Sequence, residues 1–481
     1  MKKIYRKHLK CVLMGTANHQ KQKEMFPVEA MINEILAEFK GELVDFFAAA
    51  GRSLEEAETY FTQRLGKIVT SLLGSYYEQL DRALLEDKKG RREEGMRVER
   101  RADKREVLTF LGEVQYTRTY YQTKEGKYCY PIDQVAGVSP RERLSESVQQ
   151  ALVENACKVS YRKSCEIVTG RLISAQSVMN KVRSSSVPVQ EKQEKQKVKV
   201  LHIDADEDHV TLRNGRGTIV PLISIYEGFV EKGKRRECKN IFHVSAYGVK
   251  TEELWEKALC LAEERYDLSE AKIYLHGDGA AWIQSGLEHF PRSEFVLDPY
   301  HKNKAIRQAT GSMEKEERKT YQERLYQVFR AGDREEFNKI YAELLAKNGE
   351  QNEKAGKALA YLNTHFDAIY IRYRDPEAAN GGATEPHISH VLSARLSSRP
   401  MAWSKATLEH LAPVLAAGRV CMGNVEDPVL PTPLRRLCKP KKKKAAPSSL
   451  GLADPDQAVS IPAASGKVTP LFNALRGIIA A

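Results

Sequence analysis

The sequence lacks three features that would each assign the protein to a familiar class. Its eight cysteines include no C-x-x-C pair, which disfavours a zinc ribbon and a disulfide scaffold. No apolar run approaches the roughly 18 residues of a membrane-spanning helix, so we expect no membrane partner. No G-x-x-x-x-G-K-S/T segment occurs, so nothing in the sequence indicates a nucleoside triphosphate site.

What the chain has instead is an excess of positive charge. It carries 76 Lys and Arg against 64 Asp and Glu, a formal net charge of +12 over 481 residues. This excess favours a polyanionic partner, because each Lys or Arg that meets a phosphate releases a condensed counterion. The only apolar stretch near the N-terminus, Cys11 to Met14, is too short for a signal peptide. We therefore expect the protein to stay inside the cell, in the cytoplasm.

The N-terminal part of the sequence carries helix signals followed by strand signals. Ser53-Leu54-Glu55-Glu56 has the form of a capping box, which opens a helix. Aromatic and β-branched residues between Gly112 and Gly126 indicate short strands. We predict a helical region over 1–105, a small β-meander over 106–138 and, further on, a polar linker over 184–197.

Residues 139–183 predict three short helices with the punctuation of a helix-turn-helix. Ser160 and Ser174 are placed to cap two of them, and Gly170 breaks the chain between the two. Basic residues are frequent here, so we predict DNA contacts through Arg162, Lys163, Arg171, Lys181 and Arg183. An ordinary helical hairpin with a solvated basic face is the alternative.

From residue 198 onward the pattern changes to strands separated by turns and helices. The strands indicated are 198–212, 219–226, 241–247, 271–275 and 294–297. Three successive strands, a helix and then further strands with helices is the order of an RNase H-like domain. The predicted fold is mixed α/β (a multidomain α+β chain), with a core over 198–310 and 381–425, an all-helical insertion over 311–380 and a flexible basic tail over 426–481.

Acidic residues follow or interrupt the apolar segments at three places. Asp204, Asp206 and Asp208 share one face of a strand by the two-residue alternation, so spacing does not choose among them. Asp278 stands between two glycines after a strand, where the backbone can approach a ligand closely. Glu385 stands where a helix is expected to begin. Side chains that converge from these places would form a carboxylate site.

Such a site is suited to Mg²⁺ or Mn²⁺. Phosphodiester cleavage with two ions needs oxygen ligands that bridge ions about 3.5–4 Å apart. Each acid also has a simpler explanation, as a solvated sheet-edge residue, a helix N-cap or a carboxylate favoured by a helix dipole. Asp298 and His301, which flank Pro-Tyr after the fifth strand, are interpreted as a structural pair near the site, with a metal role for His301 as the alternative.

The order of these motifs resembles that of the DDE transposases of bacterial insertion sequences, specifically the ISLre-type group, which is related to the mutator-like transposases. The segment 206–213 is similar to the family's first-aspartate strand, and Gly277-Asp278-Gly279 is similar to its second-aspartate motif. Asp298-Pro299-Tyr300-His301 fits its D-x-x-H signature, and 384–390 fits its glutamate helix. The similarity covers about residues 26–425.

The resemblance implies a catalytic, metal-binding triad of Asp206, Asp278 and Glu385 with two Mg²⁺ or Mn²⁺ ions, and it selects Asp206 over Asp204. It implies cleavage of double-stranded DNA at element ends and strand transfer to target DNA, by a homo-oligomer in the active complex. It also implies a bacterial protein associated with the nucleoid. Arg395, which continues the glutamate-helix pattern, joins the predicted DNA contacts. The alternatives are an RNase H-like structure-specific nuclease without strand transfer and a catalytically inactive DNA-binding protein.

Overall fold

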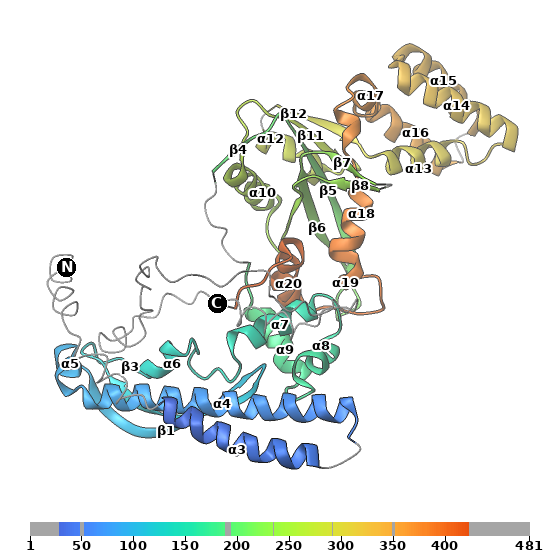
Figure 1. Ribbon diagram of the computed structural model, residues 1–481. Coiled ribbons are helices and arrows are strands. Elements are labelled where there is room, and N and C mark those ends of the chain that lie inside the picture. The colour runs from blue at the N-terminus through green and yellow to red at the C-terminus, as the bar shows by residue number, and fades with distance from the viewer. Residues whose placement is uncertain are drawn as a thin grey trace, which may run out of the picture. The chain divides into compact units, whose positions relative to one another are not determined.

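The computed structural model describes residues 28–48, 52–187, 194–233, 235–290, 292–348 and 352–422. Over these ranges the protein is a mixed α/β structure with several sheets (Figure 1). The predicted tail and part of the predicted linker lie outside the described residues. None of the described helices is both long and apolar enough to cross a membrane.

A long helix and a three-stranded sheet make up the N-terminal part. The elements are α3 (Val28–Ala48), α4 (Leu54–Glu86), α5 (Lys88–Glu93), β1 (Arg97–Thr109), β2 (Gly112–Gln122), β3 (Tyr128–Cys129) and α6 (Pro131–Val135). The capping box at Ser53 is confirmed: its side chain accepts from the Glu56 N–H, and Glu56 accepts in return. Helix α4 lies so close to the sheet that a Cβ on Gly74 would meet the Gln115 carbonyl oxygen at 2.2 Å.

Strand β1 begins earlier than the sequence indicated. Residues 97–105, which we placed in the helical region, form its first half and pair with β2. The alternation of this stretch is hidden because nearly every residue is charged and because two irregularities interrupt the register, between Val98 and Arg100 and between Arg100 and Asp103.

The three-helix module is present where it was predicted. It consists of α7 (Glu146–Ala156), α8 (Tyr161–Thr169) and α9 (Ala175–Ser184). Ser160 and Ser174 accept hydrogen bonds from backbone N–H groups in the first turns of α8 and α9. Gly170 ends α8 in the left-handed conformation at φ 57°, which glycine adopts without strain.

The central sheet has five strands in the order β12-β11-β5-β6-β9. They are β5 (Val200–Thr211), β6 (Gly217–Tyr226), β9 (Phe242–Ser245), β11 (Lys272–Gly277) and β12 (Ser293–Leu297). Strand β5 lies in the middle, antiparallel to β6 and parallel to β11. All five strands were predicted. The hairpin of β7 (Phe229–Lys232) and β8 (Arg235–Cys238) and the short pair β4 (Gln196–Lys197) with β10 (Tyr266–Asp267) were not.

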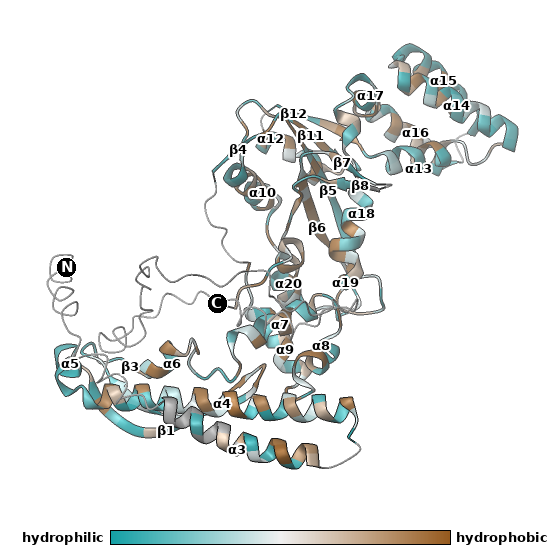
Figure 2. Ribbon diagram, in the orientation of Figure 1, coloured by the Kyte–Doolittle hydropathy of each residue, from teal (hydrophilic) through white to brown (hydrophobic). Residues whose placement is uncertain are grey.

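Apolar residues on one face of this sheet pack against helix α10 (Thr251–Arg265). Figure 2 shows hydrophobic residues along the central strands. Leu201, Ile203 and Ala205 of β5 are buried there. Because side chains alternate along a strand, the even-numbered residues of β5 face the opposite side. The short helices α11 (Ala281–Gln284) and α12 (Gly286–His289) follow β11.

Helices dominate the remainder. After β12 come α13 (Pro299–Ala309), α14 (Lys315–Ala331), α15 (Arg334–Asn348), α16 (Glu353–Thr364) and α17 (Phe366–Arg374), which share one apolar core. The chain then returns to the sheet with α18 (Thr384–Ile388), a π-helical turn (Ser389–Ser393), α19 (Ala394–Leu396) and α20 (Lys405–Ala417). A second core joins α7, α8 and α9 to α20 and to the far end of β5.

Candidate metal centre

Three aspartates project from one face of β5, and the outer two are engaged by the segment that carries Glu385. Asp204 is 2% exposed and accepts hydrogen bonds from the Tyr226 hydroxyl (3.1 Å) and the Ala383 N–H (2.8 Å). Asp208 accepts from the hydroxyls of Ser393 (2.9 Å) and Ser397 (2.7 Å). Residues on both sides of Glu385 are therefore fastened to β5.

Asp206, the middle aspartate, has no such partner among the described residues. Its carboxylate accepts only the N–H of its neighbour Glu207, at 2.8 Å. One ligand atom each of Asp206, His301 and Glu385 lies within 4.8 Å of the other two. Burial raises the pKa of Asp206 to about 7; the Glu207 N–H opposes this, and the charges of Asp278 and Glu385 add to it. Asp206, His301 and Glu385 are called the acidic cluster below.

Asp278 lies beside the acidic cluster, directly after the neighbouring strand β11. His276 of β11 is paired with Asp204 of β5, so Asp278 lies just beyond that strand at the level of Asp206. It does not join the 4.8 Å group; its Oδ1 accepts the Ala280 N–H at 2.8 Å. Its charge nevertheless acts on Asp206. The alternative prediction, that Asp278 caps the helix containing Trp282, is wrong: the N-cap of α11 is Ala280, which has no side-chain cap hydrogen bond, and Asp278 holds the turn before it.

The loop after Asp278 is held by a close contact that only glycine permits. Gly279 has φ +89°, and a Cβ there would lie 2.5 Å from the His365 imidazole. The Tyr361 hydroxyl donates to the Asp278 carbonyl oxygen at 2.5 Å. Helix α16 and the residue after it therefore fix the backbone at Asp278, which gives the helical segment a role in positioning the site.

Glu385 stands in the first turn of α18, as predicted, and its side chain is exposed. The neighbouring Thr384 is buried, and its hydroxyl donates to Asp298 Oδ2 at 3.0 Å. The π-helical turn follows directly, and such turns are frequent at functional sites. Asp298 itself caps α13 by accepting the Tyr300 N–H at 2.8 Å. Asp298 thus has the structural contacts that we expected of it.

His301 lies where the alternative interpretation, a metal role, requires it to lie. A ring nitrogen of His301, rather than an atom of Asp298, lies with Asp206 and Glu385 in the 4.8 Å group. His301 lies in the first turn of α13, whereas Asp298 is the N-cap of that helix. The two residues of the D-x-x-H motif therefore do different things.

Sequence reasoning missed the residues that hold the glutamate segment. The Gly382 N–H donates to the Tyr226 hydroxyl at 2.9 Å, and His387 Nδ1 lies 3.2 Å from Asp204 Oδ2. Burial alone would raise the pKa of Asp204, but the contact with His387 and the hydrogen bond from the Ala383 N–H hold it below its ordinary value. Asp204, Tyr226 and His387 are called the glutamate clamp below. Their partners lie far away in sequence, so no local pattern could reveal the clamp.

One predicted DNA contact is corrected by the structure. Arg395 is 7% exposed and donates to the Ala156 carbonyl oxygen at 2.6 Å, with its guanidinium 4.6 Å from the centre of the Trp403 ring. A buried guanidinium with these partners is not presented to DNA. It joins the glutamate segment to the three-helix module instead.

Of the other predicted DNA contacts, two bind groups within the protein and three are exposed to solvent. Lys181 pairs with Glu142, and Arg183 donates to Ser404 (2.9 Å) and Thr407 (3.2 Å), so both bind within the protein. Lys163 and Arg171 are exposed and share Glu166, while Arg162 is exposed. Exposed pairs of this kind are weak, so the last three remain the predicted DNA contacts of the module.

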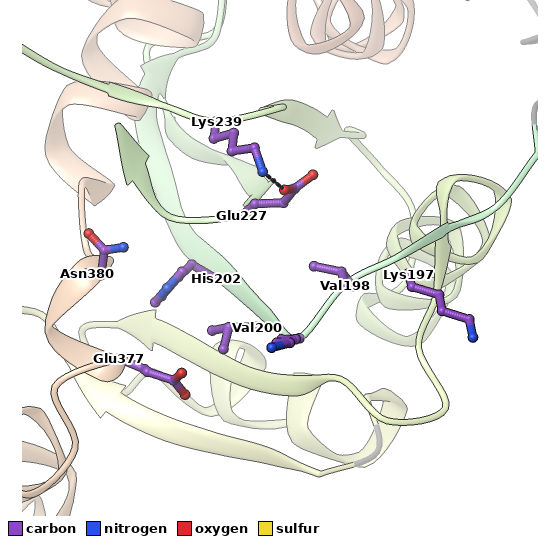
Figure 3. Close-up of a pocket in the computed structure, with 9 residues that line it drawn as sticks. Lys197, Val198, Val200, His202, Glu227, Lys239, Glu377 and Asn380 are labelled. Atoms are coloured by element: carbon purple, nitrogen blue, oxygen red, sulfur yellow. Dashed lines mark ion pairs between the residues drawn. The ribbon is translucent and has the colours of Figure 1, made fainter. Parts of the chain in front are cut away.

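A separate hollow of about 370 Å³ lies beside the first half of β5 (Figure 3). His202 and Asn380 line it, and Lys239 forms an ion pair with Glu227 at 2.6 Å (Figure 3). Its lining includes neither Asp206 nor Glu385. The acidic cluster is therefore a different feature of the same sheet face.

Residues 47–425 match the model of UPF0236, which is described as an uncharacterised protein family. The chain belongs to this family. A UPF0236 protein of Caldanaerobacter subterraneus is 36% identical over 449 residues, which cover 89% of this chain and 92% of the relative. A second from that organism is 34% identical over 474 residues, covering 94% and 97%. A UPF0236 protein of Streptococcus gallolyticus is 24% identical over 387 residues, covering 76% and 83%.

Proposed function

We propose that this UPF0236 protein is a DNA transposase with an RNase H-like catalytic core, in which Asp206, Asp278 and Glu385 hold two Mg²⁺ or Mn²⁺ ions. The observation that carries the proposal is the acidic cluster on the central strand of a sheet with the order β12-β11-β5-β6-β9. Asp206 has little internal compensation for its charge, and hard oxygen ligands are those that Mg²⁺ prefers.

The residues present fit such ions. When bound, the ions would supply electrostatic stabilisation of the attacking and leaving oxygens of an in-line displacement. The strand fixes Asp206 and the glutamate clamp fixes the approach of Glu385, so the ligand set is held on rigid elements. Arg162, Lys163 and Arg171 would hold the DNA backbone.

The proposed reaction has two steps at one site. Water attacks a phosphodiester at the element end and frees a 3′-hydroxyl, with a 5′-phosphate on the departing strand. That hydroxyl then attacks a phosphodiester of the target DNA, so a new bond forms as a target bond breaks. No residue of the chain becomes covalently attached to DNA.

The names of the relatives favour a transposase over a nuclease that only cleaves. One relative from Caldanaerobacter subterraneus is named for eleven loci of that organism and another for four. A protein encoded at many loci of one genome is what a self-copying element produces. A structure-specific nuclease gives no reason for such multiplicity.

The test uses a supercoiled plasmid that carries the gene with its flanking genomic DNA and a second plasmid as target. With Mg²⁺, the wild-type protein should cleave at the flanks and join the freed ends to the target. Glu385→Gln should abolish cleavage, whereas Glu256→Gln, an exposed change on α10, should have no effect.

The outcomes separate the candidates. Cleavage without joining would favour the nuclease, and DNA binding that needs no metal, without cleavage, would favour the inactive DNA-binding protein. Cleavage by Glu385→Gln at the wild-type rate would show that the assigned site is wrong.

A further inference from the structure

Helix α4 lies along an edge of strand β2 in the sheet of β1, β2 and β3. Glu78 of α4 accepts hydrogen bonds from the Thr117 N–H and hydroxyl, and Asp81 accepts from those of Thr119. Backbone N–H groups point sideways from a strand, so these contacts place α4 beside β2. Further along β2, Tyr120 and Gln122 are both even-numbered, so their side chains lie on the same side of the strand.

That side of the sheet carries aromatic and cationic side chains in register. Arg100 pairs across the strands with Tyr120, Arg97 pairs with Gln122, and Gln122 pairs in turn with Tyr128. Because directly paired residues lie on the same face, these side chains form one surface. We call Arg97, Arg100, Tyr120, Tyr128 and Tyr130 the tyrosine platform.

The rings of the platform are stacked rather than buried. Tyr120 stacks on Tyr128 with centroids 5.3 Å apart and an interplanar angle of 19°, and its centroid lies 4.6 Å from that of Tyr130. Tyr128 is 50% exposed. The Arg100 guanidinium lies 5.3 Å from the centre of the Tyr120 ring, with its side chain 62% exposed. A flat aromatic surface is thus open to solvent. The Arg100 guanidinium at its edge also pairs with Asp103 at 2.7 Å, a partly exposed ion pair of the weak kind.

The surroundings of the platform are strongly basic. The segment 88–105 contains nine Lys or Arg residues and four Asp or Glu residues, and strand β1 is largely hydrophilic in Figure 2. Positive charge attracts phosphates by releasing counterions, and an exposed aromatic face stacks on unpaired bases. An apolar protein or lipid partner would not be matched by this charge.

We propose that the tyrosine platform binds an unpaired DNA strand. This inference rests on the proposed function, because a protein that opens and cuts DNA produces such strands and must hold them. The bases stack on Tyr128 and its neighbours while Arg97 and Arg100 contact the backbone phosphates. The platform would be a DNA contact separate from the three-helix module.

The test measures binding of a fluorescently labelled oligothymidine to the full-length protein by anisotropy. Stacking on one aromatic residue contributes about 1–3 kcal/mol per base, so Tyr128→Ala should weaken binding about tenfold. Phe110→Ala is the matched control, since Phe110 is 59% exposed in the same sheet at the β1–β2 turn. It should change affinity less than twofold.

A second pair of variants tests the phosphate contacts. The double variant Arg97→Ala and Arg100→Ala should lower the slope of log affinity against log salt by about 1.4, because each contact with a single strand contributes about 0.7. Replacing the exposed Lys315 and Lys319 of α14 with alanine removes the same charge elsewhere and should leave the slope nearly unchanged.

Unchanged oligothymidine binding by Tyr128→Ala would overturn the platform, whatever its effect on cleavage. Equal losses from Phe110→Ala and Tyr128→Ala would also overturn it, since the sheet would then matter only as a whole. The proposed function fails separately: if Glu385→Gln cleaves normally while Tyr128→Ala loses binding, the platform stands without the transposase.

Discussion

Neutralising Asp206 should stabilise the metal-free protein, although the change removes a charged group from the proposed active site. The pKa of this carboxyl is raised from an ordinary 3.8 to about 7. Each unit of pKa shift between the unfolded and the folded protein corresponds to about 1.4 kcal/mol, so full ionisation of Asp206 destabilises the fold by about 4 kcal/mol. Because the side chain is partly exposed, solvent screening reduces the figure to about 2 kcal/mol.

The sign determines the pH dependence. An acid whose folded pKa is raised destabilises the protein when the pH lies above that pKa, and this effect shrinks as pH falls toward 3.8. Asp206→Asn should therefore raise the melting temperature in EDTA by several degrees at pH 8. The gain should be much smaller at pH 5.

Asp208→Asn is the matched control, on the same face of the same strand. Its carboxylate accepts two serine hydroxyls, and hydrogen bonds to charged groups contribute about 1.5–3 kcal/mol each. This variant should lower the melting temperature. Mg²⁺ or Mn²⁺ should stabilise the wild type by mass action and have little effect on Asp206→Asn. If Asp206→Asn destabilised the metal-free protein at pH 8, the ionised Asp206 carboxylate would be stabilising, and the claim that its charge lacks compensation would be wrong.

Two further predictions concern the supports of the site. Tyr226→Phe removes the hydroxyl that joins Asp204 to Gly382, and loss of such a support should weaken Mn²⁺ affinity, measured by titration calorimetry, about tenfold. Tyr274→Phe removes a hydroxyl bonded to Asp375 instead and should leave Mn²⁺ affinity unchanged. If both variants weakened Mn²⁺ affinity equally, the glutamate clamp would have no specific role in metal binding. Arg395→Ala should lower the free energy of unfolding by about 3 kcal/mol, because it breaks a buried bond and a ring contact. By contrast, Arg162→Ala, a change at an exposed residue, should weaken DNA binding measured by anisotropy and leave the free energy of unfolding unchanged. If Arg395→Ala weakened DNA binding without lowering the free energy of unfolding, Arg395 would be a DNA contact after all.

The sequence predicted the strands of the central sheet because each is an apolar run bounded by turns. It also predicted the helix caps at Ser53, Ser160 and Ser174, since capping depends on residues only three positions away. The charged hairpin of β7 and β8 and the first half of β1 have no apolar alternation, so they were missed.

The candidate site divides in the same way. Asp278 and Glu385 could be named from their places after a strand and at the start of a helix, whereas Asp206 was selected from three candidates on β5 by the family resemblance alone. Which of the β5 aspartates is left without a partner depends on Tyr226, Ala383 and the serines of the glutamate segment, which are remote in sequence. The burial of Arg395 against Ala156 is equally non-local. Contacts of that kind require the fold.

The central claim is that the acidic cluster binds catalytic divalent cations. Anomalous diffraction from crystals of the protein grown with saturating Mn²⁺ tests it most directly. We expect manganese density coordinated by Asp206 and Glu385, with Asp278 at or beside it, and no such density in Asp206→Asn. Well-ordered side chains at the cluster with no manganese between them would show that the cluster does not bind these ions.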